Sequence, residues 1–297
     1  MVDFRLKVFQ SVALNLSFTK ASNELFITQP AISKHIKELE SEYEAKLFNR
    51  TGNKISLTTA GKILLAYTDQ IVSLHNEIKF ELSQLNGNPE GALRIGASST
   101  ISQYVIPAAL AKFNQRFPEI KLSLINGNTE AIEKRLLKNE IDIGIVEGKP
   151  SNADIRYSSF LNDELLVFTS AQNASIPNSV TNDEFLKLPL VLRERGSGTL
   201  EIIEKNLQQG QISPKQLNVL LFLGSTEAIK SFIKTSNGVG IVSRFAIEPE
   251  LSNHIFRQIN TSGLKFNRQF YFISPQGPEP VGLVKLFLNF VQQYYNL

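Results

Sequence analysis

Residues 28–40 read TQPAISKHIKELE, and this stretch has the pattern of an amphipathic helix with a defined start. Thr28 is a good N-cap, and Pro30 lies in the first turn, where its missing N–H costs nothing. Ile32, Ile36 and Leu39 recur at helical spacing and predict one inward-facing stripe. An earlier helix is predicted over 19–25, and the short break at 26–27 joins the two helices by a tight turn.

The outer face of this second helix carries polar side chains that suit DNA. Gln29 offers an amide, Ser33 a hydroxyl, and Lys34 and Lys37 two ammonium groups. Such groups read base edges and contact phosphates in protein–DNA complexes. A small side chain such as Ser33 also lets a helix enter the major groove. An ordinary amphipathic helix with a solvated polar face would show the same pattern, so this helix alone leaves both interpretations open.

Two further elements follow this pair of helices. A turn at 51–54 between short β-prone pieces predicts a hairpin, or wing. Residues 58–85 then form one helical pattern, which at 1.5 Å per residue would span roughly 42 Å. Its near-complete heptads favour pairing with a second copy, although a buried helix of a single domain would also fit. The stripe consists of Leu64, Tyr67, Ile71, Leu74, Ile78 and Leu85, with Glu81 interrupting it.

Composition bounds the function classes. The chain is 42% hydrophobic and 20% charged, an ordinary globular composition, and its length of 297 residues suggests two or three domains. The absence of cysteine excludes disulfides, thiolate metal sites and cysteine nucleophiles, and the three histidines lie too far apart for a metal site. The first residues lack a signal-peptide pattern, and no apolar run is long enough to cross a membrane. We therefore expect a soluble, cytoplasmic protein without a metal or a cofactor.

Charge by itself says little about partners. Net charge is +3, too small to indicate a nucleic-acid partner. Bound DNA would require positive groups clustered on one face.

Residues 86–91, NGNPEG, end the long helix and mark a domain boundary. Beyond them, strand-like runs alternate with amphipathic helices, which predicts an α/β sheet with crossover helices. About 207 residues (91–297) suit two lobes better than one. Strands are predicted at 93–97, 122–125, 141–146, 165–169, 190–192, 219–223, 240–242 and 270–273, and helices at 103–117, 130–139, 200–209, 225–235 and 281–295.

Three of these strands end in polar residues directly before a helix, at 98–100, 126–129 and 193–199. Hydroxyls and free backbone N–H groups at helix N-termini favour anions, and open α/β sheets bind ligands at this edge. Each turn alone is explained by a helix cap, whereas three together favour a ligand cleft. The GSG at 196–198 lacks both the G-x-S-x-G pattern and an accompanying histidine, so we predict no catalytic site.

The residues SFTKAS at 17–22, TQPAISKHI at 28–36, LFNR at 47–50 and LTTAG at 57–61 closely resemble the N-terminal domain of LysR-type transcriptional regulators. The resemblance implies an all-α winged helix-turn-helix domain, a dimerising linker helix and a two-lobed α/β effector domain like periplasmic solute-binding proteins. The implied domains are 1–58, 59–86 and 91–297, with lobe I at 91–161 plus 269–297 and lobe II at 162–268.

Site residues follow from the same resemblance, position by position. The implied DNA-binding residues are Thr28, Gln29, Pro30, Ser33, Lys34, Lys37 and, on the wing, Arg50. Many relatives have arginine where Lys34 stands, and an ammonium cannot form the two parallel hydrogen bonds that guanidinium makes with guanine. Ser98, Thr100 and Thr129 match hydroxyl positions that bind small anions or carboxylates in relatives. The strand-end turns add the candidate effector-binding residues Ser99, Asn128, Arg195, Gly196, Ser197 and Thr199. Arg195 can pair with an anionic effector or form a salt bridge with a neighbouring carboxylate. The run at 193–199 is similar to an R-E-x-G-S-G-T pattern of members linked to sulfur assimilation or carbon fixation.

The leading interpretation is a DNA-binding transcriptional regulator controlled by a small, anionic effector bound between the two lobes. The resemblance implies double-stranded DNA with an interrupted inverted repeat at promoters, a homodimer through the linker helix and a homotetramer; RNA polymerase is a further candidate partner. A solute-binding protein without a DNA role is the rival class, and it leaves residues 1–65 unexplained. An enzyme is the third alternative, which turnover of a metabolite would support.

Overall fold

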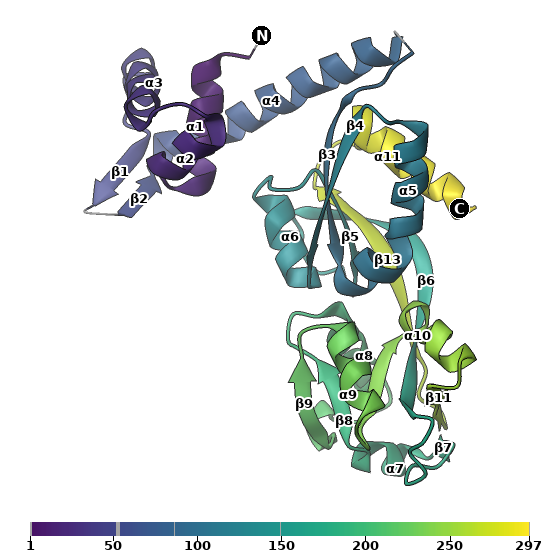
Figure 1. The fold of residues 1–297 in the computed structure, drawn as a ribbon. Helices are drawn as coiled ribbons and strands as arrows, with labels where there is room; N and C mark the ends of the chain where they lie inside the picture. Colours follow the sequence, from purple (N-terminus) through teal and green to yellow (C-terminus); the bar gives the residue numbers. More distant parts are fainter. Residues whose placement is uncertain (1, 52–53, 86, 149, 297) are drawn as a thin grey trace. The chain divides into compact units, whose positions relative to one another are not determined.

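The computed structural model describes residues 2–51, 54–85, 87–148 and 150–296. The chain forms two compact units, Met1–Gly91 and Ala92–Leu297 (Figure 1). Two residues of the predicted wing turn, Gly52 and Asn53, and the first residue of the predicted boundary, Asn86, lie outside the described residues.

Unit 1 contains the predicted pair of helices. Ser17 caps α2 because its hydroxyl accepts a hydrogen bond from the backbone N–H of Lys20, and Thr28 caps α3 in the same way. Phe26 adopts a left-handed conformation (φ 54°) and ends α2, which forms the tight turn. The elements are α1 Phe4–Asn15, α2 Phe18–Leu25, α3 Gln29–Glu42, β1 Phe48–Thr51, β2 Lys54–Leu57 and α4 Thr59–Leu85.

The core of unit 1 confirms the predicted inner stripe of α3. Ile32, Ile36 and Leu39 are buried and belong to one apolar cluster with Phe9 and Phe48. Strands β1 and β2 pair antiparallel as the expected hairpin. The unit is therefore a winged helix-turn-helix domain.

Helix α4 starts against this core and then exposes an apolar stripe. Leu64 packs on the apolar cluster of unit 1, but the stripe residues after it are 46–84% exposed within the unit. Leu82 continues the stripe at the turn where Glu81 was predicted to interrupt it. A helix buried in a single domain does not expose such a stripe, whereas a helix that pairs with another does. The exposed members are Tyr67, Ile71, Leu74, Ile78, Leu82 and Leu85.

Among the described residues of unit 2, nine strands form one sheet in the order β4-β3-β5-β13-β6-β10-β8-β9, with β11 beside β6. The strands are β3 Gly91–Ser98, β4 Ile120–Gly127, β5 Ile143–Glu147, β6 Ile155–Ser170, β8 Leu190–Arg193, β9 Val219–Leu223, β10 Val239–Ser243, β11 Phe256–Gln258 and β13 Phe266–Pro275. A short pair is formed by β7 Ser179–Val180 and β12 Asn260–Thr261. The helices are η1 Ile101–Val105, α5 Ile106–Arg116, α6 Thr129–Leu137, α7 Asn182–Lys187, α8 Gly198–Gln209, η2 Pro214–Gln216, α9 Thr226–Lys234, α10 Arg244–Ser252 and α11 Gly282–Tyr294.

Two long antiparallel strands, β6 and β13, run through both lobes of this sheet (Figure 1). The expected lobe boundaries, at 161/162 and 268/269, fall inside them. The sequence predicted only 165–169 of β6, because polar residues such as Asn162 and Asp163 interrupt its apolar pattern. It also missed α7, which has only six residues, and α10, which contains Pro249.

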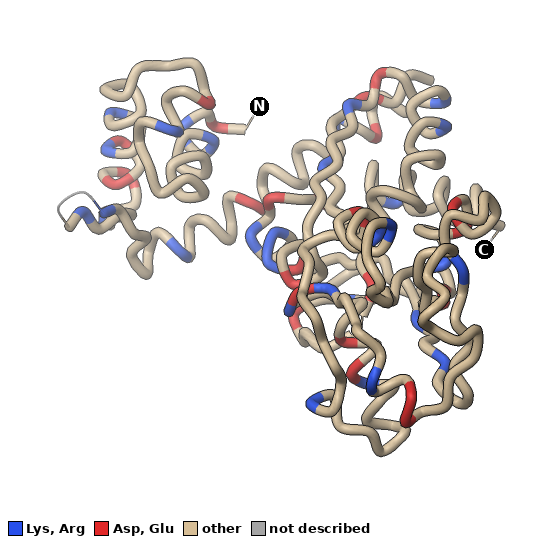
Figure 2. Tube along the Cα trace, turned by 60° about the horizontal axis from the view of Figure 1, so that its bottom comes forward, with Lys and Arg blue, Asp and Glu red and all other residues tan. Residues whose placement is uncertain are grey.

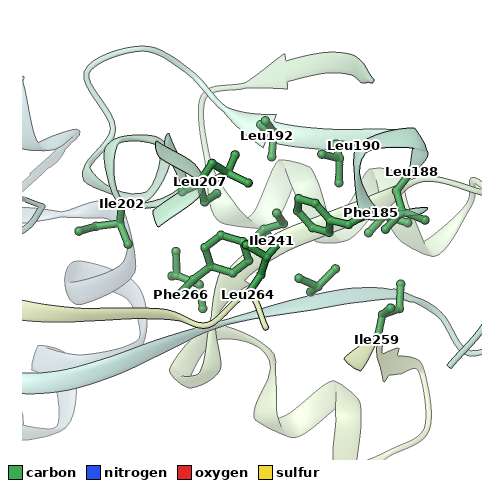
Figure 3. Packing of buried hydrophobic residues seen from close by; sticks show 14 of the residues in the cluster. Phe185, Leu188, Leu190, Leu192, Ile202, Leu207, Ile241, Ile259, Leu264 and Phe266 are labelled. Carbon is green, nitrogen blue, oxygen red and sulfur yellow. The ribbon is translucent and has the colours of Figure 1, made fainter. Parts of the chain in front are cut away.

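The inner strands β8 and β10 of the lobe II sheet are covered on both faces, so they read as continuous apolar runs. In β8, Leu190 and Leu192 face the cluster shown in Figure 3, which also contains Phe185 of α7 and Ile203 of α8. Val191, between them, faces the opposite cluster under α9. Because successive side chains of a strand alternate, one strand fills two cores.

We predict that Gly61→Ala destabilises unit 1 by about 1–3 kcal/mol or more, since an added Cβ would lie 2.1 Å from the carbonyl oxygen of Leu47. Urea unfolding of the full chain measures the loss. Gly224→Ala is the matched control: its new Cβ would meet nothing within 4 Å, and its effect should stay within about 0.5 kcal/mol. Equal stabilities of the two variants would contradict this account of the packing.

Candidate functional site

The outer face of α3 presents the expected DNA-binding side chains together. Gln29, Lys34 and Lys37 are exposed, and Ser33 is half-buried and accepts a hydrogen bond from the Gln29 amide (3.2 Å). With Pro30 they line one shallow hollow of about 600 Å³ along the helix. The exposed face therefore offers an amide, a hydroxyl and two ammonium groups in one row.

The positive groups of unit 1 near this face are available to phosphates. Within the described ranges, neither Lys34 nor Lys37 has a carboxylate at ion-pair distance. Arg50 on the wing lies 4.3 Å above the ring of Phe18, which orients its exposed guanidinium. Basic and acidic residues are interspersed along unit 1 (Figure 2), so its net charge does not indicate whether it binds DNA. His35 packs edge-on against Phe4.

In unit 2, one buried guanidinium connects the two lobes. The side chain of Arg268 has no exposed surface, and its Nε donates to Asp163 Oδ2 at 2.6 Å. Nη1 donates to Thr199 Oγ1 in lobe II (2.8 Å), and Nη2 donates to Thr100 Oγ1 in lobe I (3.3 Å). A buried charge needs such partners in place of water. Asp163 is held in turn by the hydroxyl of Ser243 (2.8 Å).

A buried carboxylate lies beside this guanidinium at the end of β5. Glu147 Oε1 is 3.6 Å from Nη1 of Arg268, and the Ser98 hydroxyl donates to the other carboxylate oxygen. The Thr129 hydroxyl donates to the backbone carbonyl of Glu147 (2.7 Å). Burial raises the pKa of Glu147 above its ordinary value, against the opposing charges of Arg268 and Arg193.

A second buried guanidinium belongs to Arg193, at the end of β8. Its Nε pairs with Glu194 Oε2 (2.8 Å), and its Nη2 contacts Ser99 Oγ (3.4 Å). Burial opposes the ionisation of Glu194, but the hydrogen bonds from Arg193 and Asn128 outweigh it and lower the pKa of Glu194. In the described part of the chain, Nη1 of Arg193 has no hydrogen-bond partner.

The structure brings most of the expected effector-binding residues together, but not the expected cation. Arg195 is exposed and forms no ion pair with any described residue, whereas Arg193, two positions earlier, is buried in the cluster. Gly196 takes a left-handed conformation (φ 81°), and its carbonyl accepts a hydrogen bond from the backbone N–H of Glu130. Thr100 and Thr199 contact Arg268 and Ser99 contacts Arg193, whereas Ser98 and Thr129 contact Glu147 and Asn128 contacts Glu194. Ser197 is buried next to them in sequence. We call these seven serine, threonine and asparagine residues, with Arg193, Arg268, Glu147 and Asp163, the interlobe cluster.

Sequence reasoning missed Arg268, Glu147 and Asp163. One signal for Arg268 was present: it alternates with Phe266 and Phe270, so it occupies an inward position of its strand. A charged residue at an inward position needs a buried partner.

No helix in the described ranges is long and apolar enough to cross a membrane. Likewise, the described residues contain no group of three or more His, Asp or Glu side chains arranged to hold a metal ion.

Comparison with known proteins assigns the family. Residues 4–62 match the model of the bacterial regulatory helix-turn-helix protein, lysR family, and residues 86–296 match the LysR substrate binding domain. The chain is 33% identical to a probable RuBisCO transcriptional regulator of Trieres chinensis, over 96% of this chain and 94% of that one. It is 31% identical to the transcriptional activator CmpR of Synechocystis, over 97% and 93% of the two chains. The chain belongs to the LysR family, and it is a LysR-type transcriptional regulator with an effector-binding domain.

Solved structures agree with this fold. The regulatory domain of Synechocystis CcmR, in complex with 2-PG, is 26% identical and superposes with a TM-score of 0.62 over 69% of this chain and 97% of that one. Full-length OxyR of Pseudomonas aeruginosa, at 19% identity, superposes with a TM-score of 0.74 over 98% and 95% of the two chains.

We predict that Arg268→Met destabilises unit 2 by roughly 3–5 kcal/mol, because it leaves Asp163 buried without its counter-charge. Arg195→Met removes the same charge from an exposed, unpaired position and should change stability by less than about 0.5 kcal/mol. The stabilities of the two variants are compared by urea unfolding, with circular dichroism as the signal. If Arg268→Met lowers the free energy of unfolding only slightly, the guanidinium does not stabilise the fold of unit 2.

Proposed function

We propose that this regulator binds promoter DNA through α3 and the wing, and that a small anion bound at the interlobe cluster changes its DNA binding. The observation that carries the proposal is the interlobe cluster, where hydroxyls from both lobes surround two buried guanidiniums. The CcmR regulatory domain, which is similar to this effector domain, was solved with 2-PG, and this supports an anionic effector. The protein then acts by binding rather than by catalysis.

DNA recognition follows from the chemistry of the α3 face. Gln29 and Ser33 are suited to base edges, whereas Lys34, Lys37 and Arg50 are suited to phosphates. Thr28 and Pro30 set the start of α3, so they position its N-terminal residues at the groove. The solved complex of the LysR-family regulator CbnR with its target DNA shares the fold of this chain, and double-stranded DNA is the corresponding partner here.

Association through α4 presents two such domains to one DNA site. Its exposed apolar stripe is suited to a second copy of the same helix. A dimer with twofold symmetry matches an inverted repeat, and a tetramer would engage two such sites. The effector would act by binding one arrangement of lobes or protomers more tightly than another.

For DNA binding, we predict that Lys37→Ala weakens affinity for all sequences and lowers the slope of log affinity against log salt by about one. Gln29→Ala should weaken the free energy of binding to specific DNA sites by about 1–3 kcal/mol. It should also relax the sequence preference, because the Gln29 amide reads a base edge. Fluorescence anisotropy over a salt series measures both effects. Lys215→Ala, an exposed lysine of unit 2, is the control. Unchanged binding by both α3 variants would place the DNA interface elsewhere.

For the effector, we predict that one member of a panel of small anions and carboxylates both stabilises the protein and changes its affinity for its own upstream DNA. The panel contains sulfate, O-acetylserine, phosphoglycerates, phosphoenolpyruvate and 2-PG. A ligand at one hundred times its dissociation constant adds about 2.7 kcal/mol of stability, which a thermal-shift assay detects. If no member changes DNA affinity, regulation by a small anion is wrong for this protein.

A further inference from the structure

Helix α9 of lobe II holds a buried ammonium group outside the interlobe cluster. Lys230 is only 7% exposed, and its Nζ lies 2.9 Å from Glu227 Oε1 and 2.6 Å from Glu250 Oε1. A buried charge needs partners that replace its hydration, and these two carboxylates, one from α9 and one from α10, supply them. The three residues therefore form an ion-pair network within lobe II.

Tyr104 of lobe I joins this network. Its hydroxyl donates a hydrogen bond to Glu227 Oε1, the same oxygen that Lys230 contacts. The Nζ of Lys230 lies 5.1 Å from the centre of the Tyr104 ring, within the range of a cation–π contact. One side chain of lobe I thus makes two different polar contacts with lobe II.

The two groups in this hydrogen bond hold the protonation states that it needs. Burial raises the pKa of Tyr104, and the hydrogen bond to Glu227 raises it further, so the phenol keeps its proton. Burial opposes the ionisation of Glu227, but the hydrogen bonds from Lys230 and Tyr104 outweigh it and lower the pKa of Glu227. A neutral donor therefore meets a charged acceptor, and such a hydrogen bond is stronger than one between neutral groups.

Tyr104 belongs to η1, a π-helical turn that directly precedes α5. Turns of this kind are rare and are frequent at functional sites. The residue before η1 is Thr100, which accepts a hydrogen bond from Arg268, and η1 also packs against α10 of lobe II. A single turn therefore connects the interlobe cluster to the contacts of Tyr104.

The Tyr104 bond differs from the other phenol hydrogen bonds among the described residues. Tyr157 donates to Glu133 and Tyr295 donates to the carbonyl of Val105, and both of these bonds lie within lobe I. Only the bond from Tyr104 crosses to lobe II. Its acceptor, the Glu227 side chain, is 54% exposed, so water can take the place of Tyr104 when the bond breaks.

We infer that Tyr104 is a reversible latch between the lobes: its contacts with Glu227 and Lys230 stabilise the closed arrangement of the effector domain, and their loss favours an open one. A change in these contacts shifts the balance between the two arrangements without any change in the fold of either lobe. The link to regulation, through Thr100 and η1, rests on the proposed function.

One backbone amide reports whether the lobes are closed. The N–H of Glu130, in lobe I, donates to the carbonyl of Gly196 in lobe II (3.3 Å). Glu130 lies in the first turn of α6, where a helix provides no acceptor for its own N–H groups. Exchange of this hydrogen with solvent therefore depends on the contact between the lobes.

The test is hydrogen–deuterium exchange of the full-length protein, without DNA or added ligand, read by mass spectrometry of peptides that contain Glu130. Tyr104→Phe keeps the ring and removes the hydroxyl, and it should raise the exchange rate of the Glu130 amide about tenfold, the effect of one lost hydrogen bond to a charged group. Glu227→Ala removes the acceptor and should raise the rate at least as much. The double variant should exchange no faster than Glu227→Ala alone, because the two residues act through one bond.

Tyr295→Phe is the matched control. It also removes a phenol hydrogen bond to a residue of η1, the bond from Tyr295 to the carbonyl of Val105 (2.6 Å), but this bond lies within lobe I. The exchange rate of the Glu130 amide should stay close to that of wild type, since no contact between the lobes is lost. The control therefore separates the interlobe bond from a general loosening of η1.

The inference is overturned if Tyr104→Phe exchanges like wild type, if Tyr295→Phe raises the exchange rate equally, or if the effects of Tyr104→Phe and Glu227→Ala add in the double variant. These outcomes are separate from failure of the proposed function, because the experiment uses neither DNA nor an effector. If no anion changes DNA affinity but Tyr104→Phe still raises exchange, regulation is refuted and the latch stands. If an anion changes DNA affinity but Tyr104→Phe leaves exchange unchanged, the latch is refuted and regulation stands.

Discussion

The guanidinium of Arg268 lies between two lobes with no access to water, and a charge in that position is tolerated only where an ion pair and hydrogen bonds replace its hydration. The pairing of β13 with β6 supplies the first partner, because their register sets Arg268 directly opposite Asp163. Thr100 and Thr199 supply two more, one from each lobe. Separation of the lobes would remove from this buried charge its hydrogen bond to Thr100 and its ion pair with Glu147.

Close approach of the lobes depends on small residues at the same place. A Cβ on Gly198 would lie 2.2 Å from the carbonyl oxygen of Glu147, so the start of α8 can rest on the end of β5 only because this residue is glycine. That carbonyl also receives the Thr129 hydroxyl. The contact places the start of α8, where Thr199 accepts a hydrogen bond from Arg268, beside the end of β5.

The two units were predictable to different degrees for a physical reason. In unit 1, the information is local: the inward spacing of Ile32, Ile36 and Leu39 and the N-cap at Thr28 specify α3 within fifteen residues. In unit 2, most strands were found from their apolar runs, but the first half of β6 was missed. Asp163 in this half is buried against Arg268, 105 positions away, and local pattern carries no sign of such a partner.

The sequence by itself determined the helix-turn-helix, the long helix with its apolar stripe, the alternating α/β domain and the hydroxyl-rich strand ends, because caps, periodicity and turn residues act over a few positions. Only the tertiary structure decided that Arg193 is buried and Arg195 is exposed, two residues apart on one loop. It also decided that Arg268 meets residues 100, 163 and 199. Those choices depend on how distant strands pair and how closely two lobes pack, and such long-range geometry has no counterpart in local spacing.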